Sequence, residues 1–156
     1  MAKPWIVKDL DSDEKLNVCL KKILRTRFRE AASYVPAAMK GEDIEDLHDV
    51  RVSIRRLESV LKIFESSFPE KLYAKEIKTI RDFLRSMGKV RELDVFLQTL
   101  NDYSARIAES ERAPIDRIIQ NYAPAYTKRR TKLEKTLAEL SSKSFNSRFE
   151  KLIDSL

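Results

Sequence analysis

The sequence predicts an all-α protein, an antiparallel helical bundle of about four long helices with shorter ones beside them. Only two of the 156 residues are glycine, and 42% are hydrophobic while 36% are charged. The apolar residues recur with the 3.6-residue period of amphipathic helices. A composition rich in Lys, Arg, Glu, Leu and Ile favours helices over strands joined by tight turns. No linker or low-complexity segment divides the chain, so we expect one domain over residues 1–156.

The first helix is expected to begin near Ser12. Asp11 followed by Glu14 resembles a capping box, in which two side chains satisfy unpaired backbone donors at a helix start. Pro36 should kink or end this helix, because proline has no N–H to donate. The apolar stripe that we expect to be buried consists of Leu16, Leu20, Ile23, Leu24, Phe28 and Ala31.

The second helix is expected over about 43–66, after a break at Gly41. Acidic residues in its first turn suit the positive end of a helix dipole. Phe68 and Pro69 should form the turn that follows. Its apolar face consists of Leu47, Val50, Ile54, Leu57, Leu61 and Phe64.

The rest of the chain is also predicted to be helical. A third helix should cover about 70–87, with Gly88 as a C-cap or kink, and a helical pattern then resumes to about Glu111. Pro114 should open the next helix, which Pro124 should distort or delay, and a short helix should end the chain. The residues expected to face inward are Leu72, Ile77, Ile80, Leu84, Met87, Leu93, Leu97, Leu100, Ile115, Ile118, Ile119, Tyr126, Leu133, Leu137, Leu140, Phe145, Phe149, Leu152 and Ile153.

The net charge of +6 and the isoelectric point near 9.4 predict a field that attracts anions. Charge alone does not distinguish nucleic acid, anionic lipid, polyphosphate or an acidic protein. A single cysteine, Cys19, excludes an internal disulfide and fits a reducing compartment, so we expect a cytoplasmic protein. The apolar part of MAKPWIVKDL is too short for a signal peptide, and no apolar run approaches the roughly 20 residues of a membrane span.

Catalysis is not expected. His48 is the only histidine, and no second histidine, cysteine spacing or arranged serine accompanies it as a metal ligand or nucleophile would require. We therefore expect no enzyme, no cofactor and no metal. A structural hydrogen bond at the start of the second helix and a direct phosphate contact remain equally open roles for His48.

Basic side chains form stripes on three of the expected helices. On a helical wheel, His48, Arg51, Arg55 and Lys62 lie within about 60° of one another, and Arg56 flanks them. From Arg51 to Lys62 the helix rises about 16 Å, a span that suits several consecutive phosphates. Similar spacing recurs in two further sets, namely Lys22, Arg25 and Arg29, and Lys128, Lys132 and Lys135. Each stripe alone could be a solvated helix face, but solvated faces usually mix charges of both signs.

Three segments resemble the CHAD family, the conserved-histidine α-helical domain. They are HDVRVSIRRLESVLKIF at His48–Phe64, MGKVRELDVFLQTL at Met87–Leu100, and the terminal LSSKSFNSRFEKLI. The resemblance covers nearly all of the chain and corresponds to the N-terminal half of a typical family domain. It implies a helical bundle that binds inorganic polyphosphate through a basic groove and has no catalytic activity of its own.

By position, the resemblance gives His48, Arg51, Arg55 and Arg56 the roles of the family's first motif. Arg91 and Asp94 match the second motif, in which an i, i+3 pair would be structural. Family members usually contain two related bundles with a second basic motif, and this chain has one. It is therefore either a truncated or minimal form, or two chains associate as a homodimer. The sequence also departs from the family pattern at Glu58 and Glu92.

Taken together, the residues and the resemblance predict a non-catalytic protein that binds inorganic polyphosphate. The predicted phosphate-binding residues are Lys22, Arg25, Arg29, His48, Arg51, Arg55, Arg56, Lys62, Lys89, Arg91, Lys128 and Lys132. A nucleic-acid-binding helical domain is the second interpretation, with few aromatic residues among the stripes for stacking on bases. A scaffold for an acidic protein partner is the third.

Overall fold

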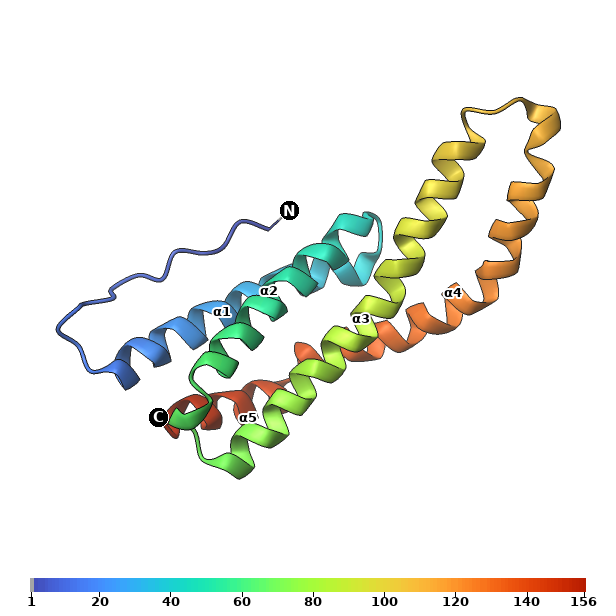
Figure 1. The fold of residues 1–156 in the computed structure, drawn as a ribbon. Coiled ribbons are helices and arrows are strands. Elements are labelled where there is room, and N and C mark those ends of the chain that lie inside the picture. Colours follow the sequence, from blue (N-terminus) through green and yellow to red (C-terminus); the bar gives the residue numbers. More distant parts are fainter. Residues whose placement is uncertain (1) are drawn as a thin grey trace.

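The computed structural model describes residues 2–156 and confirms the predicted all-α bundle (Figure 1). The α-helices are α1 (Leu16–Lys40), α2 (Ile44–Ile63), α3 (Glu70–Ser104), α4 (Ala113–Leu140) and α5 (Lys143–Asp154), and the 3₁₀ turns are η1 (Glu65–Ser67) and η2 (Glu109–Glu111). Helices α1 and α2 form one antiparallel pair, and α3 and α4 form a longer one. Within the described residues there is no strand.

The start of α1 differs from the prediction. The helix begins at Leu16, four residues after Ser12, and its N-cap Lys15 makes no capping hydrogen bond through its side chain. The predicted capping box is wrong because Asp11 accepts a hydrogen bond from the Asp13 backbone in a local turn. The Glu14 carboxylate binds Lys22 instead of a backbone N–H.

The turn between α1 and α2 forms where the sequence predicts it. Helix α1 continues through Pro36 to Lys40, so the proline does not end it. Gly41 then adopts φ +71°, a left-handed conformation that an L side chain rarely adopts. Asp43 caps α2 by accepting a hydrogen bond from the Glu45 backbone at 2.8 Å.

Helix α3 is longer than predicted, because Gly88 neither ends nor caps it. The helix runs without interruption from Glu70 to Ser104, and Gly88 lies buried in its middle. Leu72, expected to face inward, is 42% exposed, whereas Ile77, Ile80 and Met87 are buried. The helical pattern expected to reach Glu111 stops at Ser104, and only the short η2 turn follows.

Helix α4 carries Pro114 in its first turn and Pro124 in its interior. It changes direction partway along (Figure 1), as expected where a proline removes a backbone donor and its ring crowds the preceding turn. Beyond α1 and α2, the second half of α3 and the first half of α4 project together as a helical hairpin (Figure 1).

One hydrophobic core joins the five α-helices. Helix α5 contributes Phe145 and Phe149, whose rings pack with Phe28 of α1 at centroid distances of 5.8 and 4.7 Å. Phe83 of α3 meets Phe145 edge to face at 5.1 Å. The four residues predicted to be buried in the last helix are all buried. This core fixes α1, α3 and α5 relative to one another and leaves their basic faces at the surface.

Candidate functional site

One of the predicted phosphate-binding arginines, Arg56, is bound instead to a buried carboxylate. Glu30 of α1 is fully buried and accepts hydrogen bonds from Arg27 and Arg56, each at 2.6 Å. Arg56 also donates to the Ala2 backbone carbonyl, and Arg27 donates to that of Trp5. The extended segment that precedes α1 therefore covers this cluster. Arg56 is engaged in holding α1, α2 and the N-terminal segment together.

Four more of the predicted residues are also paired with carboxylates. Lys22 binds Glu14 at 2.6 Å and the Asp9 carbonyl, and the hydrogen bond to Glu14 raises the pKa of Lys22. Arg25 joins α1 to α5, through Glu150 and Asp154. The remaining two pairs are Lys62 with Glu58 at 2.7 Å and Arg91 with Glu45 at 2.6 Å. These cations already have anionic partners.

Seven of the predicted residues have no carboxylate within ion-pair distance in the described part of the chain. They are Arg29, His48, Arg51, Arg55, Lys89, Lys128 and Lys132. Arg29 lies exposed on α1, His48 is partly buried on α2, and Arg55 is exposed on α2. The helix α1 stripe is thus mostly neutralised, whereas the charges on α2, α3 and α4 are mostly available.

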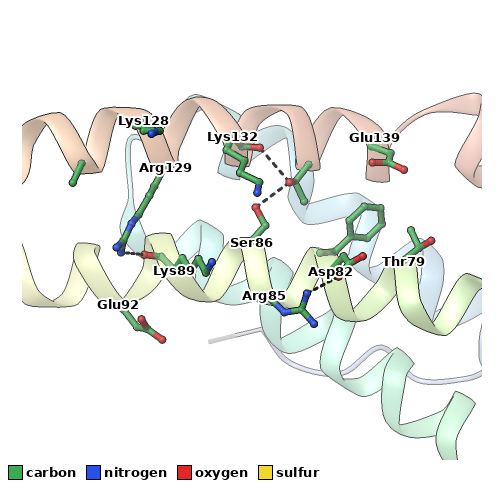
Figure 2. Close-up of a pocket in the computed structure, with 13 residues that line it drawn as sticks. Thr79, Asp82, Arg85, Ser86, Lys89, Glu92, Lys128, Arg129, Lys132 and Glu139 are labelled. Carbon is green, nitrogen blue, oxygen red and sulfur yellow. Dashed lines mark hydrogen bonds and ion pairs between the residues drawn. The ribbon is translucent and has the colours of Figure 1, made fainter.

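Lys89, Lys128 and Lys132 line one cavity of about 870 Å³ between α3 and α4 (Figure 2). Arg85 and Arg129 line it too. Arg129 donates to the Lys89 backbone carbonyl at 3.1 Å across the cavity, and Arg85 pairs with Asp82 at 2.8 Å. Five cations and three acids therefore surround this space, the acids being Asp82, Glu92 and Glu139.

The cavity also has polar groups that carry no charge. The Thr136 hydroxyl donates to Ser86 at 3.0 Å, which ties α4 to α3 beside Lys132 (Figure 2). Hydroxyl groups together with Lys and Arg are the donors that proteins direct at phosphate oxygens. The arrangement can therefore accept a negatively charged, oxygen-rich ligand.

Arg51 connects the α2 stripe to α3. A Cβ atom added at Gly88 would lie 3.8 Å from an Arg51 guanidinium nitrogen, an ordinary contact distance, so the Arg51 side chain packs against α3 at Gly88. Gly88 directly precedes Lys89, and the α2 stripe thus reaches α3 at the level of the cavity. The Arg51 Nε is buried without a hydrogen-bond partner in the described residues, a state that costs free energy in a folded protein.

The predicted pairing of Arg91 with Asp94 is wrong. Arg91 donates instead to the Ile44 carbonyl at 2.9 Å and to the Glu45 carboxylate, at the start of α2. Asp94 is buried, which raises the pKa of its carboxyl group, and it accepts a hydrogen bond from Tyr126 of α4. Both residues are structural, since each joins α3 to a neighbouring helix.

Two arginines that line the cavity, Arg85 and Arg129, are not among the predicted phosphate-binding residues. The spacing in the sequence could have indicated them. Arg85 precedes Lys89 by four positions and Arg129 precedes Lys132 by three, so each arginine shares a helix face with a predicted lysine. Their meeting across the cavity depends on the pairing of α3 with α4, which a helical wheel cannot give.

The described residues hold neither a metal-binding cluster nor a membrane-spanning helix. Residues 2–156 contain no cluster of three or more His, Cys, Asp or Glu side chains placed to hold a metal ion. None of the helices in this range combines the length and the apolar character needed to cross a membrane.

Comparison with known proteins supplies the family. A search of curated proteins found no match to this chain. The model of the CHAD domain family matches residues 22–156, a range that includes the α2 stripe and the whole cavity between α3 and α4. The chain therefore belongs to the CHAD domain family.

Proposed function

We propose that this chain binds inorganic polyphosphate, without catalysing a reaction on it, through unpaired cations on α2, α3 and α4. The main support for the proposal is that the cations fall into two sets, one paired with carboxylates and one not. Those on α1 are largely held by carboxylates, whereas Lys89, Lys128 and Lys132 share a cavity and have none. The CHAD family is associated in general with polyphosphate binding.

The proposed path of the polymer runs from the α2 stripe across α3 to α4. Arg55 and Arg51 lie one turn apart on α2, and Arg51 meets α3 next to Lys89. A compact anion needs only one cluster of donors, whereas an extended chain of phosphates gains from cations spread over three helices. Binding adds anionic acceptors where the unliganded protein leaves like charges close to one another, which is mildly destabilising.

The test is a salt titration of polyphosphate binding by wild type and variants. Binding should weaken steeply as salt rises, because bound counterions are released when cations contact phosphates. The double variant Lys128→Gln/Lys132→Gln should bind at least tenfold more weakly at 0.15 M salt. Its logarithmic salt slope should fall by about 0.7 for each lost contact, the value known for flexible single strands.

Arg25→Gln is the matched control, because it removes a positive charge that Glu150 and Asp154 already neutralise. Its affinity for polyphosphate should stay within about twofold of wild type. Arg51→Ala and Arg55→Ala should each weaken binding while leaving the helical content unchanged. Equal affinities for wild type, the double lysine variant and both arginine variants would contradict the proposed surface.

Single-stranded RNA of matched charge is the competitor that separates the interpretations. The cavity lining contains one aromatic residue, Phe83, which is buried in the core and so is poorly placed to stack on a base. We therefore expect polyphosphate to displace the RNA at equal phosphate concentration. Preference for RNA would favour nucleic-acid binding, and tight binding to neither polymer would favour an acidic protein partner.

A further inference from the structure

The N-terminal segment, residues 2–15, contains no helix and runs back along α1 (Figure 1). Ala2 is the one buried residue of the segment, whereas Trp5 is 42% exposed and Ile6 is 85% exposed. Little apolar surface therefore leaves the solvent when the segment docks, and burial of apolar surface is the main source of stable docking. The segment is held mainly by polar contacts, which another polar ligand can replace.

Three backbone carbonyls of the segment accept hydrogen bonds from cations of α1 and α2. The pairs are Ala2 with Arg56 at 2.7 Å, Trp5 with Arg27 at 2.9 Å, and Asp9 with Lys22. We call Lys22, Arg27 and Arg56 the covered cations. Their acceptors follow one another along an extended chain, as the oxygens of a linear polyanion do. A charged phosphate oxygen accepts a stronger hydrogen bond from Lys or Arg than a neutral carbonyl oxygen does.

The charges favour an anion at this face. Residues 2–15 contain four acids and three lysines, a net charge of −1, so the rest of the chain carries +7 to make the total of +6. The Glu14 carboxylate of the segment pairs with Lys22 at 2.6 Å. Arg27 and Arg56 share the single carboxylate of Glu30, which leaves one positive charge uncompensated. Removal of the segment therefore exposes a face that attracts anions.

We propose that the covered cations form a second binding site for an extended polyanion, and that the N-terminal segment occupies this site as an internal competitor. The inference rests on the proposed function and adds a face that lies outside the α2–α4 surface. Arg56 directly follows Arg55 in the sequence, so a long polymer on the α2 stripe can continue onto the covered cations. The segment lies outside residues 22–156, which match the family model.

Trp5 provides a direct readout, because it is the only tryptophan of the chain and lies in the segment. Polyphosphate is titrated into the whole chain while calorimetry follows binding and fluorescence follows Trp5. The emission of Trp5 should shift to longer wavelength, and its quenching by acrylamide should rise, in step with binding. Binding without a change in Trp5 would overturn this inference and leave the proposed function standing. Absence of binding heat would contradict both.

Glu14→Gln should raise the affinity for polyphosphate about threefold, within the range that a partly exposed ion pair supports. The reason is that Lys22 loses its anionic partner in the segment and becomes available to the polymer. Asp13→Asn is the matched control, because it changes the net charge equally, and among the described residues its carboxylate makes no hydrogen bond or ion pair with a covered cation. Its affinity should stay within about 1.5-fold of wild type, since salt screens a charge without a direct contact.

A double variant tests whether the gain acts through Lys22. Glu14→Gln/Lys22→Gln should lose the gain in affinity that Glu14→Gln shows, and circular dichroism should show all variants folded. Equal gains in Glu14→Gln and Asp13→Asn would reduce the effect to net charge and overturn the inference. A gain that persists without Lys22 would also overturn it, because the polymer would then not use the covered cation that Glu14 holds.

Discussion

Glu30 shows how a charged residue is accommodated in a protein interior. Its carboxylate is fully buried, but two arginines donate to it from α1 and α2, and backbone carbonyls of the N-terminal segment accept from the same arginines. Buried charges are tolerated where every partner is present, and the loss of one partner leaves the others uncompensated. Arg56 matches the family motif by position, but in this chain it belongs to that cluster.

Glu30→Ala should therefore lower the free energy of unfolding by about 3 kcal/mol, because two arginines lose their shared acceptor. Urea denaturation followed by circular dichroism measures this change. Glu42→Ala is the control, since Glu42 is exposed in the α1–α2 turn. Equal stabilities of the two variants would show that the Glu30 cluster contributes nothing.

The two glycines should respond to substitution in opposite directions. Gly88→Ala should raise the free energy of unfolding by about 0.5 to 1 kcal/mol, because alanine is the better helix former and its Cβ would lie at an ordinary contact distance from Arg51. Gly41→Ala should lower it by about 1 kcal/mol or more, because the residue has φ +71° and a Cβ would crowd the Arg130 guanidinium. Urea midpoints check both values, and a stabilising Gly41→Ala would contradict this account.

At the scale of elements, amphipathic periodicity predicts where helices exist better than where they end. The buried stripes of α2 and α5 follow from spacing alone. The end of α3 does not, because the helix continues through Gly88, which lies buried in its middle, and ends at Ser104. The start of α1 was misplaced for a similar reason, since Glu14 binds a lysine two turns along instead of a backbone donor.

The N-cap of α5 gives an element-scale prediction. Ser142 accepts a hydrogen bond from the Phe145 backbone at 3.1 Å, and α5 places two phenylalanines in the core. Ser142→Ala should therefore lower the free energy of unfolding by about 1 kcal/mol. Ser144→Ala, at an exposed position in the same first turn, should change it by less than about 0.5 kcal/mol. Chemical denaturation of the two variants in parallel decides between the outcomes.

At the scale of the whole molecule, the candidate site could be predicted only in part. Helical wheels identify stripes on single helices, such as Lys128, Lys132 and Lys135, of which the first two line the cavity. They could not show that Arg25 meets α5, because that pairing joins residues 125 and 129 positions apart. Which cations are neutralised is decided by tertiary contacts, and so is the cavity between α3 and α4.

The hydrogen bond between α4 and the end of α1 has a consequence for the order of folding. Arg130 donates to the carbonyl of Ala38 at 2.7 Å, although 92 positions separate the two residues. Contacts between distant positions form after local ones, because closing a long loop costs entropy before the contact repays it. Helices α1 and α2 are adjacent in sequence and can pair first. The carbonyls at the end of α1 accept the hydrogen bond from Arg130 only after α4 has docked.

Arg130→Ala should accordingly speed unfolding several-fold and leave the refolding rate nearly unchanged, since the lost contact forms after the rate-limiting step. Stopped-flow fluorescence of Trp5 measures both rates, with Arg117→Ala, at an exposed position of α4, as the control. A slower refolding rate would show instead that the Arg130 hydrogen bond forms before the rate-limiting step of folding. We expect the hydrogen bond from Arg130 to Ala38 to form last, after α1 and α2 have paired, and to be the first of these contacts to break when the protein unfolds.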